Sequence, residues 1–149
     1  MKYIIGMLIA LSAVATAHSQ PVVRHGALHV DGTRLADQRG ETVVLRGMSF
    51  GWHNLWPRVY NAGAVKWLKE DWKCTVLRAS MGIELNDSGY LKSPASSTAR
   101  IRAVVDAAIR EGIYVIIDWH DHNIHQQEAL NFFGEMARLY GNQPNVIYE

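Results

Sequence analysis

The sequence predicts an α/β protein in which helices cover a parallel sheet, and it favours a closed (β/α)8 TIM barrel. Strand-like segments begin near residues 42, 74, 113 and 145, so one strand and one helix recur about every thirty residues, the size of a parallel crossover unit. The strands are rich in Val, Ile and Leu, as in a parallel sheet with covered faces. Polar residues with reactive side chains follow the strands, where barrels place active sites. An open doubly wound sheet is the alternative, but no G-x-G-x-x-G motif follows any strand.

A short β-hairpin is predicted before the first strand of the sheet. Within residues 27–37, Asp31-Gly32 is a favoured two-residue turn between alternating segments, and we expect this hairpin to cap one end of a larger structure. The strands that follow are predicted over 41–50, 74–81 and 113–120, with a last one beginning at 145.

Three helices are predicted between these strands, each from apolar residues that recur with a helical period. The first covers 61–72 and places Val65, Leu68 and Trp72 on one side. The second covers 96–112 and ends at Gly112 as a C-cap. The third covers 125–141, and its apolar face contains Leu130, Phe133, Met136, Ala137 and Tyr140. Strands and helices together amount to about three and a half βα units.

The N-terminal residues are predicted to be a secretory signal peptide, over residues 1–17 or to about residue 20. One Lys stands near the start, an apolar stretch follows, and Ala15-Thr16-Ala17 forms a small-residue cleavage site. An uncleaved N-terminal anchor is the alternative. No later segment has the length of a membrane span. We therefore expect a secreted, extracellular or periplasmic protein whose domain begins near residue 21.

Composition excludes several classes of partner. The formal net charge is +1 and no cluster of Lys or Arg runs longer than two residues, so neither nucleic acid nor a membrane surface is an expected partner. Cys74 is the only cysteine, so there is no disulfide framework. Its apolar surroundings in "KCTVLRAS" predict a small buried side chain.

The stretch "GIYVIIDWHDHNIH" (112–125) ends a predicted strand in imidazole and carboxylate groups. His120, His122 and His125 have the spacing H-x-H-x-x-H, which resembles the H-x-H-x-D-H of metallo-β-lactamase-like hydrolases, but Ile124 stands where that motif has Asp. A metal-dependent hydrolase using these three histidines is therefore one hypothesis. Solvated or hydrogen-bonded loop histidines are the alternative, and our expectation is no metal and no cofactor.

Arg78 is a charge inside the apolar strand "TVLRAS". Such a charge is costly unless it is paired, so a carboxylate must lie nearby, and the planar guanidinium suits one. The alternatives are a role at a barrel mouth and a structural ion pair with Asp118 or Glu84. By strand alternation Asp118 shares a face with His120, so we expect it to orient His120 or to balance the charge of Arg78.

Aromatic residues crowd the loop after the first strand, where Trp52, His53, Trp56 and Tyr60 occur within nine residues. Rings with polar tips can stack on sugars and hydrogen-bond their hydroxyl groups. Alternatively, the rings cover the barrel end or the hairpin.

Four segments in order resemble the family 5 glycoside hydrolases, specifically the secreted endo-β-1,4-glucanases or cellulases. They are "GALHVDGTRLADQRGETVVLRGMSF", "WLKEDWKCTVLRASMG", "AAIREGIYVIIDWHDHN" and "FFGEMARLYGNQPNVIYE", and they span roughly Gly26 to Glu149. The resemblance implies a (β/α)8 barrel and a retaining glycosidase with two catalytic Glu residues. It implies a β-1,4-glucan substrate, no cofactor and a monomer. Mannan, xylan or mixed-linkage glucan are the alternative substrates.

The resemblance also implies roles for individual residues. Arg78 matches the second-strand Arg that hydrogen-bonds the nucleophile, and His120 matches a third-strand His that contacts substrate. Trp52, His53 and Trp56 lie in a loop that binds sugar in this family, and His122 is expected to border the cleft. Asp118 is expected to support Arg78 and His120 from behind.

The same resemblance implies that both catalytic Glu residues lie beyond residue 149. The family's acid/base Glu follows the "IYE" segment by a few residues, so Glu149 is not that residue. Because a (β/α)8 barrel needs about 250 residues, we expect residues 21–149 to be the N-terminal part of a longer protein, interrupted in strand 4 and inactive alone.

Overall fold

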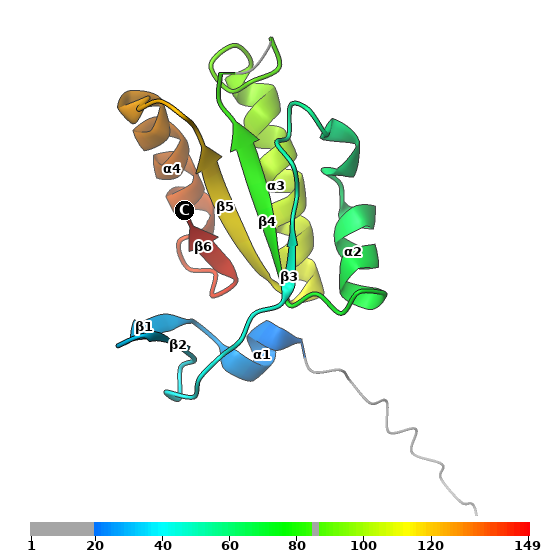
Figure 1. Cartoon of the computed structure of the whole chain (residues 1–149), viewed down its shortest axis with the longest axis vertical. Helices are drawn as coiled ribbons and strands as arrows, with labels where there is room; N and C mark the ends of the chain where they lie inside the picture. The colour runs from blue at the N-terminus through cyan, green and yellow to red at the C-terminus, as the bar shows by residue number, and fades with distance from the viewer. Residues whose placement is uncertain (1–19, 85–86) are drawn as a thin grey trace, which may run out of the picture.

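The computed structural model describes residues 20–84 and 87–149 (Figure 1). The signal peptide predicted over residues 1–17 lies outside these described residues. None of the described helices is both long enough and apolar enough to cross a lipid bilayer.

Four parallel strands form the central sheet, and their order in space is their order along the chain. They are β3 (Gly47–Ser49), β4 (Val76–Gly82), β5 (Tyr114–His120) and β6 (Val146–Tyr148). A doubly wound sheet reverses its strand order at a switch point, whereas a barrel adds each strand beside the last. The observed order is therefore that of a barrel wall.

The three longer helices lie on the same side of this sheet (Figure 1). They are α2 (Ala62–Glu70), α3 (Pro94–Glu111) and α4 (Gln126–Tyr140), and a short 3-10 helix, η1 (Pro57–Val59), precedes α2. The core fills the space between the helices and the sheet, and its fully buried side chains include Leu77, Ala79, Met81, Ile101, Val104, Val105, Ile117, Phe132 and Met136.

The helix boundaries follow local chemistry. Asn61 caps α2, because its side chain accepts a hydrogen bond from the backbone N–H of Ala64. Gly112 ends α3 in the left-handed conformation, with φ of 68°, which a side chain would disfavour. The predicted C-cap and the predicted apolar stripe of this helix are both confirmed.

Two predicted helix faces are wrong in part. Trp72 does not continue the stripe of α2, because the helix ends at Glu70 and Trp72 is 56% exposed, with its ring against Trp67. In α4, Leu130 and Ala137 are exposed and Phe132 is buried instead. Phe132 packs against the rings of Tyr90 and Trp119, so a contact from outside the helix decides its orientation.

The predicted hairpin is confirmed as β1 (His29–Asp31) paired with β2 (Arg34–Ala36). Its turn is Gly32-Thr33, one residue later than predicted, because Asp31 still pairs with Arg34. The predicted strand 41–50 is reduced to β3, since Thr42 bridges back to Ala36 of the hairpin.

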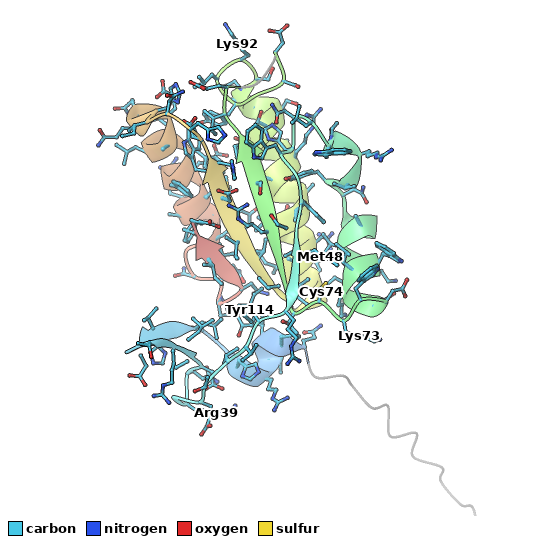
Figure 2. All side chains as sticks on the ribbon, viewed as in Figure 1. Arg39, Met48, Lys73, Cys74, Lys92 and Tyr114 are labelled. Atoms are coloured by element: carbon cyan, nitrogen blue, oxygen red, sulfur yellow. The ribbon has the colours of Figure 1, made fainter. Side chains whose placement is uncertain are left out.

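The hairpin lies at the N-terminal ends of the sheet strands, together with α1 (Pro21–His25), a helix that the sequence did not predict (Figure 1). The hydroxyl group of Tyr114 donates a 2.7 Å hydrogen bond to the carbonyl of Gly26 and ties the two parts together. Figure 2 shows Cys74 and Tyr114 at this end and Lys92 at the opposite end. Cys74 is buried as predicted, and burial raises the pKa of its thiol.

Candidate active site

One face of the sheet carries polar side chains, and strand register aligns them. Ser49 pairs with Arg78 across β3 and β4, and Ser80 pairs with Asp118 across β4 and β5. Paired residues of a parallel sheet point to the same face, so these four side chains share one face, opposite to the helices. Glu149 joins them beside Asp118, since its backbone bonds to Ile117 and Trp119.

Arg78 uses every N–H group of its guanidinium on this face. Nε lies 2.7 Å from one carboxylate oxygen of Glu149, and Nη2 lies 3.1 Å from the other. Nη2 also lies 3.0 Å from Asp118 Oδ2, while Nη1 donates to the hydroxyl groups of Ser80 at 2.9 Å and Ser49 at 3.3 Å. The side chain is therefore fixed in one orientation before any ligand binds.

The predicted ion pair of Arg78 with Asp118 is confirmed, and the one with Glu84 is wrong, because Glu84 contacts Asn123 and His125. Sequence reasoning missed Glu149 as a partner of Arg78. The bidentate hydrogen bond with Arg78 lowers the pKa of Glu149 and raises that of Arg78.

Asp118 links Arg78 to His120. Its Oδ2 atom lies 3.1 Å from His120 Nδ1, so two donors converge on one carboxylate oxygen. An ionised Asp118 favours the tautomer with the proton on Nδ1, which leaves Nε2 of His120 as a hydrogen-bond acceptor. Burial raises the pKa of Asp118, and Ser80, Arg78 and His120 partly offset this. The predicted role of Asp118 in orienting these neighbours agrees with this geometry.

Trp52, His120 and His122 gather at the end of this polar face. The ring centroids of Trp52 and His120 are 5.0 Å apart, and those of Trp52 and His122 are 5.6 Å apart. Trp52 is half-buried, so one part of its ring packs and another part stays accessible. Trp56 is 52% exposed and lies against Gly51, where a Cβ atom would meet its ring at 2.4 Å.

The predicted contact between His53 and substrate is wrong in this structure, because the ring is fully buried. His53 Nδ1 accepts a hydrogen bond from the Gly82 N–H at 3.0 Å, and Nε2 donates to the Ser88 carbonyl at 3.2 Å. Burial lowers the pKa of His53 to about 4, so the ring is neutral. Tyr60 is also buried, and its hydroxyl group bonds to backbone groups of Ser80. Both residues position the loop after β3.

The three histidines of the H-x-H-x-x-H pattern do not converge. His120 and His122 have ring centroids 6.0 Å apart, but His125 turns to Asp121 and Glu84. Among the described residues, the group of three metal-ligating side chains that does form is Glu84, Asp121 and His125. The hypothesis of a hydrolytic metal held by the three histidines is therefore wrong: His125 is the N-cap residue of α4, and its two ring nitrogens face Asp121 and Glu84.

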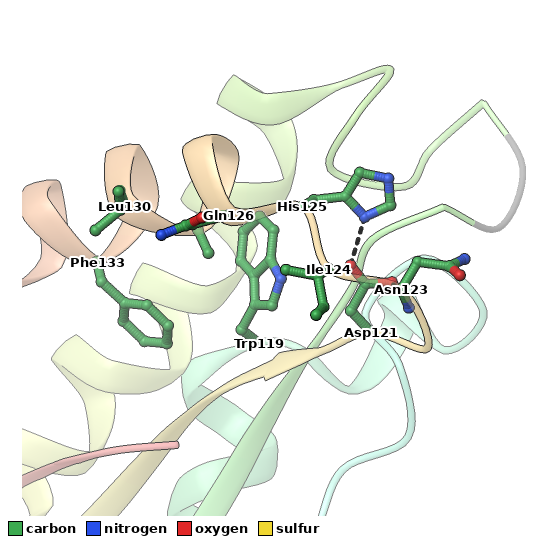
Figure 3. Close-up of a pocket in the computed structure, with 9 residues that line it drawn as sticks. Trp119, Asp121, Asn123, Ile124, His125, Gln126, Leu130 and Phe133 are labelled. Carbon is green, nitrogen blue, oxygen red and sulfur yellow. Dashed lines mark hydrogen bonds and ion pairs between the residues drawn. The ribbon is translucent and has the colours of Figure 1, made fainter.

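An apolar pocket lies elsewhere, on the helix side of the sheet. It has a volume of about 420 Å³ and an apolar wall that includes Trp119, Leu130 and Phe133 (Figure 3). Because Trp119 alternates with Asp118 and His120 along β5, its ring points to the helix side. The pocket is thus an apolar groove beside α4, and the polar face of the sheet is the better candidate for chemistry.

Helices on a single face of the sheet and polar side chains on the other are the arrangement expected of one wall of a (β/α)8 barrel. The chain belongs to glycosyl hydrolase family 5: the family model described as "Cellulase (glycosyl hydrolase family 5)" matches residues 36–149. The resemblance seen in the sequence is thereby confirmed, and so is the fold class.

Several known proteins are similar to this chain. Endoglucanase N of Pectobacterium atrosepticum is 38% identical over 98% of the chain, and Endoglucanase Z of Dickeya dadantii is 42% identical over 95% of it. The chain spans 33% of the length of each of these relatives.

Solved structures resemble the chain as well. A structure from Cytophaga hutchinsonii has a TM-score of 0.84 and 48% identity, over 87% of this chain and 42% of that one. The catalytic domain of the Thermobifida fusca endoglucanase Cel5A has a TM-score of 0.78 and 34% identity, over 87% of this chain and 43% of that one. A variant of this second enzyme was solved with cellotetraose.

Proposed function

We propose that residues 21–149 form the N-terminal part of the catalytic barrel of a secreted endo-β-1,4-glucanase. The observation that carries this proposal is the cluster of Arg78, Asp118 and His120 on the polar face of a family 5 barrel wall. The relatives named endoglucanases and the Thermobifida fusca structure with cellotetraose support a β-1,4-glucan as the substrate.

The remaining part of the barrel is proposed to cover the two open edges of this sheet. Large apolar side chains are exposed beside both edges: Trp67 and Trp72 near α2, and Leu130 and Tyr148 near α4 and β6. Exposed apolar clusters of this kind mark surfaces that pack against something else. The chain also spans less than half of the Cytophaga hutchinsonii structure and of the Thermobifida fusca catalytic domain.

The proposed reaction is a retaining double displacement. One Glu protonates the oxygen of the leaving sugar, and a second Glu, about 5 Å away, attacks the anomeric carbon and forms a glycosyl-enzyme intermediate. Water then hydrolyses this intermediate, with the first Glu acting as base. We place both Glu residues in the part of the protein that this chain does not contain.

The role proposed for Arg78 is to hold the nucleophile ionised and oriented. Because all N–H groups of the guanidinium already donate hydrogen bonds, a new acceptor must displace one of the present ones. The nucleophile carboxylate would therefore replace a serine hydroxyl group or Glu149 as an acceptor from Arg78. Asp118 keeps Arg78 and the imidazole of His120 in place while this exchange occurs.

His120, Trp52 and His122 are proposed to bind the sugar chain, and Trp56 is the outlying aromatic contact. With Nδ1 of His120 turned to Asp118, its Nε2 can accept a hydrogen bond from a sugar hydroxyl group. The accessible part of the Trp52 ring, beside both histidines, suits the apolar face of a pyranose.

The test uses the complete protein and carboxymethyl-cellulose. Internal cleavage, with NMR showing the β-anomer as the first product, is the expected result for a retaining endoglucanase. The α-anomer as first product would contradict the mechanism. If the protein cleaves mannan, xylan or mixed-linkage glucan in preference to carboxymethyl-cellulose, that polysaccharide becomes the assigned substrate and the proposal of a β-1,4-glucan is wrong. The 149-residue chain alone should show no turnover above a control.

A further inference from the structure

Two carboxylates from different loops face one imidazole at the carboxyl end of the sheet. His125 Nδ1 lies 2.5 Å from Asp121 Oδ2, and His125 Nε2 lies 3.3 Å from Glu84 Oε1 (Figure 3 shows the first contact). One ligand atom from each of the three side chains falls within 4.8 Å of the others. None of these residues belongs to the cluster around Arg78.

The charge of this group is unbalanced. Within residues 20–84 and 87–149, neither Glu84 nor Asp121 forms an ion pair with Lys or Arg, so one imidazole serves two carboxylates. Glu128 adds a third negative charge to the field at His125. A protonated ring would neutralise only part of the local charge, whereas a divalent cation that takes the place of a ring proton would neutralise more of it.

Asp121 is held in position for such a ligand. Its side chain is 5% exposed, and its Oδ1 atom accepts hydrogen bonds from the backbone N–H groups of His122 at 2.8 Å and Asn123 at 3.2 Å. Its other oxygen, Oδ2, is the atom that faces His125. The carboxylate is thus anchored through one oxygen and presents the other to the site.

We propose that Glu84, Asp121 and His125 bind a divalent transition-metal ion, for which Zn²⁺ is the appropriate probe. Two carboxylate oxygens and one imidazole nitrogen are an accepted zinc ligand set, and water completes a tetrahedron. Ligand atoms around one tetrahedral zinc ion lie about 3.3 Å apart, so atoms already within 4.8 Å need only small movements.

The ion would join two loops of the same barrel end. Glu84 follows β4, whereas Asp121 and His125 lie between β5 and α4. Asn123 already reaches across, with its Nδ2 atom 2.9 Å and 2.8 Å from the two oxygens of Glu84. The role inferred for the metal is to fix these loops, without any part in bond cleavage.

The test is titration of the metal-free protein with ZnCl₂ by isothermal calorimetry, which needs no enzymatic activity and is independent of the proposed function. We expect one equivalent of zinc to bind. Glu84→Gln and His125→Ala should each weaken the affinity at least tenfold. Glu84 is exposed, so its substitution tests the site without endangering the fold.

His122→Ala and His120→Asn are the matched controls and should leave the affinity within twofold. Circular dichroism verifies that each variant is folded. No saturable binding, or binding that both ligand variants retain, overturns the proposal. Binding lost with His122→Ala or His120→Asn but kept in the ligand variants also overturns it, because it places the zinc ion on the other histidines.

Discussion

The two faces of the central sheet differ in nearly every property, although they are built from alternating residues of the same strands. Leu77, Met81 and Ile117 are completely buried against helices. Arg78 and Asp118, their neighbours in sequence, belong to an ion-pair network on the other face. In β4 and β5, the face packed against the helices therefore stabilises the fold, and the opposite face holds the polar side chains proposed to form the active site.

The largest expected effect on stability contrasts Ile117 with Ile116. Ile117 is fully buried among helix residues, whereas Ile116 is half-buried on the polar face. Ile117→Ala should lower the free energy of unfolding by about 2–5 kcal/mol, because it leaves a cavity. Measured in the same 149-residue chain, Ile116→Ala should lower the free energy of unfolding by less than half as much. Equal losses in urea unfolding would show that the two faces are packed alike.

A second contrast separates the buried imidazole of His53 from the accessible one of His120. The pKa of His53 is lowered to about 4, from an ordinary value of 6.5. Between pH 6.5 and 4 the unfolded chain binds a proton that the folded protein excludes. Stability should therefore fall across this range by about 3 kcal/mol and level off below it.

The variant His53→Gln isolates this effect. Gln can still accept from Gly82 and donate to Ser88, but it does not titrate. The loss of stability between pH 6.5 and 4, measured by urea unfolding, should be smaller in His53→Gln by about the same amount. Parallel pH profiles for the two proteins would mean that His53 is accessible to protons in the folded state.

The smallest predicted effect concerns the half-buried Trp52 and the exposed Trp72. Trp52→Ala should weaken the binding of cellotetraose by the complete protein about tenfold, because it removes a stacking surface beside His120. Trp72→Ala is the matched control, since Trp72 packs on Trp67 at the end of α2. Calorimetric titration should show unchanged affinity for the control, and equal weakening in both variants would contradict the assignment.

The sequence predicted most of the sheet and the partners of Asp118. The spacing of apolar segments located β4, β5, β6 and α3 closely, because strands and helices of one repeating unit have characteristic lengths. Alternation along β5 placed Asp118 and His120 on one face, and the observed 3.1 Å contact agrees. Glu149 was missed as a partner of Arg78, although counting alternation along "VIYE" could have found it.

What could not be predicted depends on contacts between distant segments. Burial of His53 results from Gly82 and Ser88, which lie 29 and 35 residues away in sequence. In the same way, the orientation of the His125 ring depends on its ion pair with Glu84, which lies in another loop. The sequence of a loop does not indicate whether its histidine is buried, accessible or paired with a carboxylate, because the same ring nitrogens make the contacts in all three cases.

The central claim is that the polar face of the sheet is one wall of a glycosidase active site, with Arg78 at its centre. The most direct test is the steady-state kinetics of Arg78→Ala in the complete protein on carboxymethyl-cellulose. We predict that kcat falls about 10²–10³-fold, the usual loss when one preorganised electrostatic contact to the reacting groups is removed, with the circular dichroism spectrum unchanged. An unchanged kcat would show that Arg78 only stabilises the fold.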